Sequence, residues 1–265
     1  MSSSQDTTMI LGIHGVLEMK PWLRPAYDDD TYEEDMHSLI LARTTAYGFG
    51  FLSEGDPPCE LWWHNDAAED WTQDGLVHEV AMFQSMIPPE RKGHRLPIRP
   101  AATIMEESLR RVGDLDLAAF HALLPLHMST ADDRLNLLYA QNWFSLSSPD
   151  AAAQIIVSVS VRDQDKTAEL ASQVQAAAVD GGADHMTVSP TTPDVVDQEA
   201  LAGELHRHPS SEDLSLGLVY QCQVPEWSMD AAVWATEVFA DALRASGITT
   251  SVLITTSHQE IKATG

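Results

Sequence analysis

The clearest alternation of hydrophobic and polar positions lies in residues 154–161, QIIVSVSV. Every second residue from Ile155 to Val161 is apolar and β-branched, and this period of two predicts a half-buried strand. The next segment, DKTAELASQVQAAAVDGG, spaces its apolar residues as a helix does and ends in two glycines. That pattern favours a helix that stops at the glycines, and a short strand is expected over residues 186–188.

A second copy of this pattern follows. The segment LGLVYQCQV, residues 216–224, alternates again, and Ser228 is placed to cap a helix that Gly247 ends. The β-branched run ITTSVLITT then predicts a last strand. Strand, helix, strand therefore occurs twice, which is the order of a ferredoxin-like sandwich. The long connection between the copies is expected to carry a short helix over residues 198–205.

The N-terminal half predicts a similar mixture. Strands are expected in MILGIHGVLEM, GLVHEVAMFQSMI, DLDLAAFHALLPLHM and RLNLLYAQNWFSL, and a helix in AATIMEESLRRVG. The run HSLILARTTAYGFGF is interpreted as a strand because it is rich in Tyr, Phe and Thr. The prediction is an α+β protein, with an N-terminal α+β half over residues 1–150 and a ferredoxin-like βαββαβ half over residues 151–265.

The charge of the chain excludes some partners. Asp and Glu outnumber Lys and Arg by 40 to 15, which gives a formal net charge of −25. Such a surface repels nucleic acids and anionic membranes and attracts basic proteins. The two cysteines are far apart, the N-terminus lacks a secretory pattern, and no apolar run could span a bilayer. The expectation is a cytoplasmic protein without nucleic-acid or membrane partners.

One segment departs from the acidic character. Residues 76–115 hold 5 acids against 6 bases, and most of the bases lie in PPERKGHRLPIRP. Its prolines and glycine predict a basic loop over residues 88–100. The loop cations are candidate binding residues for an acidic surface on another copy of the chain or for an anionic ligand, or they are simply solvated. These cations are Arg91, Lys92, Arg95 and Arg99.

The densest aromatic cluster is CELWWHNDAAEDW, residues 59–71. Trp62, Trp63, His64 and Asp66 could line a ligand pocket, since Trp offers flat apolar surface and a His–Asp pair could move a proton. On a strand, however, Trp62 and Trp63 point to opposite faces. The favoured interpretation is structural, with one tryptophan in the core and the other at an interface.

Two histidine motifs are candidate sites. His206 and His208 could bind a metal, but no matching ligand cluster is evident, and exposure at the end of a short helix is the favoured interpretation. The segment ILGIHG resembles the oxyanion-hole strand of α/β-hydrolases. The nucleophile motif Gly-x-Ser-x-Gly is absent from the sequence, so His14 is expected to be a strand-end histidine between turn glycines. No cofactor is predicted.

The sequence thus favours a non-enzymatic acidic binding protein that recognises a basic protein, as immunity proteins, antitoxins and inhibitors do. One alternative is a self-assembling homo-oligomer whose basic loop meets acidic faces. Another is a small-molecule enzyme on a ferredoxin-like scaffold, because that fold hosts many functions. The lack of a recognisable catalytic constellation favours the first two.

Overall fold

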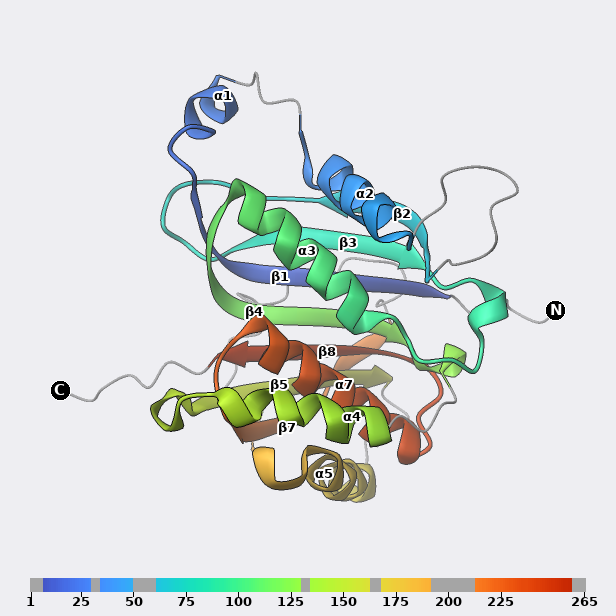
Figure 1. The fold of residues 1–265 in the computed structure, drawn as a ribbon. Coiled ribbons are helices and arrows are strands. Elements are labelled where there is room, and N and C mark those ends of the chain that lie inside the picture. The colour runs from blue at the N-terminus through green and yellow to red at the C-terminus, as the bar shows by residue number, and fades with distance from the viewer. Residues whose placement is uncertain are drawn as a thin grey trace.

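One antiparallel sheet with helices on one face makes up the protein (Figure 1). The computed structural model describes residues 7–29, 34–49, 61–129, 134–162, 168–191 and 213–258. The strands are β1 (Thr8–Met19), β2 (Trp63–Ala68), β3 (His78–Met86), β4 (Gly113–Pro125), β5 (Ala153–Arg162), β6 (Thr187–Pro190), β7 (Leu214–Val224) and β8 (Ser251–His258). The helices are α1 (Arg24–Asp28), α2 (Met36–Tyr47), α3 (Ile98–Val112), α4 (Arg134–Ala140), α5 (Ala168–Gly182) and α7 (Met229–Ala245). The predicted α+β class is confirmed.

The two halves of the sheet have the same strand order. The order is β2-β3-β1-β4-β8-β5-β7-β6, and β4 pairs with β8 at the centre, with Leu123 opposite Leu253. Going outward from this pair, the N-terminal half has the order β4-β1-β3-β2 and the C-terminal half has the order β8-β5-β7-β6. Each half therefore places its fourth strand at the centre of the sheet, followed by its first, third and second strands. The C-terminal half has the predicted order of strands and helices, and the N-terminal half repeats it. The ferredoxin-like assignment and the division at residue 150 stay predictions.

The helix α7 begins and ends as its sequence predicts. Ser228 Oγ accepts a hydrogen bond from the backbone N–H of Ala231 at 3.2 Å, which satisfies one of the free donors of the first turn. Gly247, just after the helix, has a φ of 90°, which suits glycine. The helix is buried along most of its length. Because α3 and α7 each precede the central strand of their own half, they meet over the middle of the sheet.

Two strand predictions are wrong. Residues 37–51 were expected to form a strand, but α2 occupies most of this run, because Asp35 caps it through the N–H of Ser38 at 2.7 Å and Gly48 ends it at a φ of 71°. Residues 134–146 form α4 and a 3-10 segment (Gln141–Leu146) instead of a strand. Leu137 and Phe144 of this segment are buried, and the Phe144 ring lies 5.1 Å from that of Trp234, whereas Tyr139, Trp143 and Leu146 are exposed.

The strand β5 is more buried than its alternation predicts. Its apolar face lies in the main core, but Ile156, Ser158 and Ser160 on the other face are also at most 4% exposed. The prediction of a half-buried strand is therefore wrong for β5. Period-two alternation distinguishes the two faces of a strand, but small serines can also be covered.

The predicted turn at ILGIHG is also wrong, because β1 continues through it. Gly15 serves a close approach of two strands: a Cβ at this position would collide with the backbone carbonyl oxygen of Asp116 in β4. His14 lies within the strand and is buried. Its ring is 4.3 Å from that of His121, and its Nε2 is 3.4 Å from Glu79 Oε1.

Among the helices of the described residues, none is long and apolar enough to cross a membrane. The short helix expected over residues 198–205 lies outside the described residues.

Candidate ligand-binding site

The predicted basic loop is irregular only in part. Pro89–Arg91 form one 3-10 turn, and Gly93 adopts a φ of 90° and donates its N–H to the carbonyl of Met128 at 2.8 Å. The chain then enters α3 at Ile98, so Arg99 belongs to the first turn of a helix and not to a loop. The loop prediction is right for residues 92–97 and wrong for residues 98–100.

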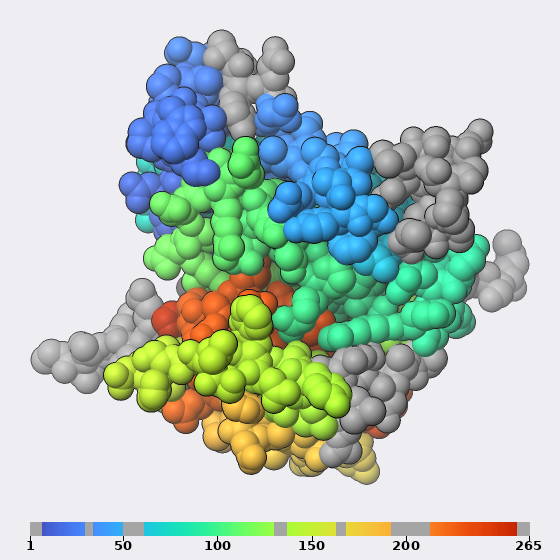
Figure 2. All heavy atoms as spheres, viewed as in Figure 1, coloured from blue at the N-terminus to red at the C-terminus, as the bar shows by residue number. Residues whose placement is uncertain are grey.

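Three of the four predicted cations converge on a cavity of about 500 Å³. Arg91, Arg95 and Arg99 line it, whereas Lys92 is exposed on the surface. Figure 2 shows the surrounding elements next to one another: the segment near residue 90 in teal, α2 in blue and α3 in green. Apart from the arginines, the lining consists of Tyr47, Phe49, Leu61, Leu96, Pro97, Pro100, Thr103, Ile104 and Glu237. A cavity of this size, mostly apolar with a few polar groups, is typical of small-molecule sites.

Glu237 of α7 holds two of these arginines. Its Oε1 lies 2.5 Å from the guanidinium of Arg95 and its Oε2 2.9 Å from that of Arg99. Arg99 is also 3.2 Å from Asp230. Glu237 is only 4% exposed, and a buried carboxylate needs such partners to remain charged. Arg95 and Arg99 therefore pair within the chain, which removes the main reason to expect them to seek an acidic face on another copy.

The charges of the cavity differ in sign from those of the whole protein. Three guanidinium groups face one carboxylate among the lining residues, and Asp230 adds a second carboxylate beside Arg99. Among the lining residues cations therefore outnumber carboxylates, in a chain whose formal net charge is −25. Arg91 Nε is buried and has no hydrogen-bond partner. An unsatisfied buried donor is costly, so an acceptor on a ligand would be favourable there.

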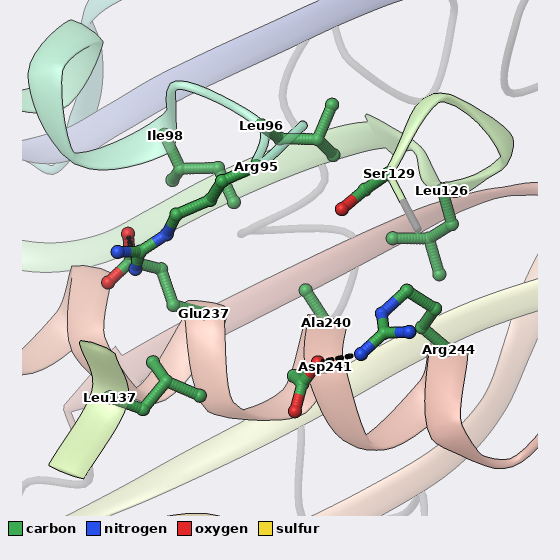
Figure 3. A pocket seen from close by; sticks show the side chains of 10 residues that line it. All are labelled: Arg95, Leu96, Ile98, Leu126, Ser129, Leu137, Glu237, Ala240, Asp241 and Arg244. Carbon is green, nitrogen blue, oxygen red and sulfur yellow. Dashed lines mark hydrogen bonds and ion pairs between the residues drawn. The ribbon is translucent and has the colours of Figure 1, made fainter. Parts of the chain in front are cut away.

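A smaller cavity is also lined by Arg95 and Glu237 (Figure 3). Its volume is about 30 Å³, which is room for a water molecule and not for an organic ligand. Asp241 and Arg244 of α7 border it and form an ion pair of 2.5 Å. Arg95 and Glu237 thus line both a ligand-sized space and a water-sized one.

The aromatic cluster serves mainly the core. Trp62 is 1% exposed and packs against Phe83, whereas Trp63 is 38% exposed, so the two side chains differ as predicted. A β-bulge separates His64 from Asp66. The partner of His64 is His37, with 3.2 Å between His64 Nε2 and His37 Nδ1. None of the four predicted residues of this cluster lines the 500 Å³ cavity.

The pKa of His64 is lowered to about 4, first by burial and then by the neighbouring His37. The unfolded chain, with an ordinary pKa near 6.5, binds more protons between these two values, so stability contributed by neutral His64 is lost as the pH falls from about 6.5 to about 4. Because His64 is partly exposed, we expect a loss of about 1 kcal/mol at pH 5 relative to pH 7.

Urea unfolding at both pH values tests this expectation. The variant His64→Asn should lose less stability on acidification than the native protein does. The variant His94→Asn, which removes an exposed histidine, should behave as the native protein. Equal acid sensitivity of all three proteins would contradict the proposed role of His64.

The remaining metal candidates, His206 and His208, lie outside the described residues. Within the part of the chain that the structure describes, no group of three or more His, Cys, Asp or Glu is arranged to hold a metal ion.

The residue that sequence reasoning missed is Glu237. A signal was present, because Glu237 falls on the same helical face as Val233, Trp234 and Val238, which are buried. A carboxylate on an apolar helix face is almost always paired when it is buried, so its position could have prompted a search for a cationic partner.

Comparisons with known proteins give no family. No protein-family model matches the chain, and no curated protein or solved structure is significantly similar to it. The functional argument therefore depends on the residues of the site.

Proposed function

We propose that this protein binds a small organic anion in the 500 Å³ cavity between α3, α7 and the segment before α3. The observation that carries the proposal is the convergence of Arg91, Arg95 and Arg99 on one apolar cavity. The planar guanidinium group is well suited to carboxylates and phosphates. The apolar lining would bind the rest of the ligand and strengthen the charged contacts by excluding water.

Glu237 is a positioning residue in this proposal. It lies on a rigid, buried helix and fixes two arginines that come from another element. Side chains that are held in place before binding lose less conformational entropy when the ligand arrives. The lining combines cations and apolar groups without a nucleophile–base pair among its described residues, which supports binding rather than a catalytic step.

Calorimetric titration with organic anions, at constant ionic strength, tests the proposal. At least one of octanoate, 4-phenylbutanoate and phenyl phosphate should bind with a Kd below about 1 mM. We expect Arg91→Gln to weaken binding about 10–100-fold, as for the loss of a charge-assisted hydrogen bond of about 1.5–3 kcal/mol. Arg91 is chosen because it makes no contact with Glu237 that would confound the result with stability.

The matched control is Lys92→Gln, which removes the same charge from the adjacent exposed position. Its affinity should stay within about twofold of the native value, because exposed charges interact weakly in salt. Equal weakening in both variants would indicate only a general electrostatic effect. That result, or no binding by any of the anions, would contradict the proposal.

Recognition of a basic protein partner, self-association and a cytoplasmic location stay untested predictions from the charge of the chain.

A further inference from the structure

We infer that the ligand is an elongated aryl carboxylate that binds along α3, with its carboxylate at the arginines and its ring against Tyr47 and Phe49. This inference rests on the proposed function and names the ligand class for the same cavity. The two ends of the cavity differ in chemistry, and the orientation of α3 relates them.

The cavity follows α3 from Arg99 to Ile104, about one and a half turns. Arg99, at the start of the helix, contacts Glu237, whereas Glu107 accepts hydrogen bonds from the Tyr47 hydroxyl at 3.0 and 2.9 Å. Thr103 and Ile104 line the cavity between these points. The five residue steps from Arg99 to Ile104 rise by about 7.5 Å, so the arginine end and the aromatic end are separated by roughly the length of a short aryl-alkanoate.

The far end presents aromatic faces. The rings of Tyr47 and Phe49 are stacked, with centroids 5.6 Å apart and an interplanar angle of 23°. Phe49 also packs edge-on against Trp62 at 6.0 Å. The Tyr47 hydroxyl is engaged by Glu107, and the Arg43 guanidinium lies over the Tyr47 ring, 4.8 Å from its centroid, so we expect a ligand to contact mainly Phe49 at this end. Aromatic rings prefer offset-stacked or edge-to-face partners over aliphatic chains of equal area, which favours an aryl group.

The near end favours a single negative charge. Arg95 and Arg99 already pair with Glu237, whereas Arg91 lines the cavity with a buried Nε that has no hydrogen-bond partner. A carboxylate would neutralise Arg91 and could accept two parallel hydrogen bonds from a guanidinium fork. A phosphate monoester would place close to two negative charges near the buried Glu237, and like charges repel strongly where water is excluded.

The test compares ligands on the full-length protein by calorimetry at constant ionic strength. The probes are 4-phenylbutanoate, octanoate as a flexible aliphatic carboxylate, and phenyl phosphate as an aryl dianion. We expect 4-phenylbutanoate to bind at least about tenfold more tightly than either of the others. This comparison needs no variant and is unaffected by changes in folding.

The aromatic end is tested with Phe49→Leu, which keeps an apolar side chain. It should weaken 4-phenylbutanoate about 2–10-fold and leave octanoate unchanged, whereas Trp63→Leu, at an exposed position outside the cavity, should change neither. Octanoate or phenyl phosphate binding as tightly as 4-phenylbutanoate, with loss in Arg91→Gln, would overturn the aryl carboxylate and leave the proposed function standing. Absence of binding by all three probes would overturn both.

Discussion

Replacing Arg95 and Arg99 together by methionine is expected to lower the free energy of unfolding by about 3–5 kcal/mol. The reason is the environment of Glu237, which is 4% exposed and has these two guanidinium groups as its ion-pair partners. Without them the carboxylate must stay charged without compensation or take up a proton, and both cost stability. Each single variant keeps one partner and should lose less than half of this amount.

A triple variant separates the loss of a partner from the loss of packing. Adding Glu237→Met to the double variant removes the buried charge and retains an apolar side chain of similar length. Stability should then return close to the native value, because an apolar replacement of a complete buried ion pair is often neutral or stabilising. Urea unfolding of the native protein and the variants measures these differences. A double variant as stable as the native protein, or a triple variant no better than the double, would contradict the role assigned to Glu237.

Gly15→Ala is expected to destabilise the protein by about 2–3 kcal/mol, within the range for overpacked cores. The new Cβ would collide with the backbone oxygen of Asp116 and with the side chain of Leu115. A flexible side chain could move aside, but the Asp116 oxygen belongs to the backbone of β4, which is paired with β1 at this position. Relief would therefore require β1 and β4 to move apart.

The matched control is Gly181→Ala in α5. There the nearest atom to a new Cβ is Val238 Cγ1 at 3.4 Å, an ordinary contact distance. Because alanine is favoured over glycine in a helix by up to about 1 kcal/mol, this variant should be as stable as the native protein or slightly more so. Thermal unfolding of both variants and of the native protein measures these differences in stability. A Gly15→Ala protein as stable as Gly181→Ala would show that β1 and β4 are not as close as described.

The elements that the sequence predicted well are those whose local signals agree. In α7 the cap at Ser228, the apolar periodicity and Gly247 all indicate the same helix. In α2 the signals conflict, because Tyr, Phe and Thr suggest a strand while Asp35 and Gly48 mark the ends of a helix. The helix forms because its capping residues provide hydrogen bonds for the free backbone groups at the helix ends, and amino-acid composition alone does not indicate such bonds.

The site was only half predictable. The contrast between one cationic segment and an acidic chain drew attention to the arginines that line the cavity, although their role in binding stays a prediction. Their partner, however, lies 138 residues from Arg99 in the sequence. It is brought near by the pairing of β4 with β8, which sets α3 beside α7. The local sequence pattern carries no information about that pairing. From the sequence alone, the possible partners of the arginines are therefore solvent, a ligand or another copy of the chain.

A crystal structure of the protein with 4-phenylbutanoate is the most direct test of whether the arginine-lined cavity binds an organic anion. The predicted result is a carboxylate within hydrogen-bonding distance of Arg91, with the aryl ring beside Phe49 and the Arg95–Glu237 and Arg99–Glu237 pairs still formed. An empty cavity at saturating ligand, or a ligand bound only elsewhere on the surface, would contradict the proposed site.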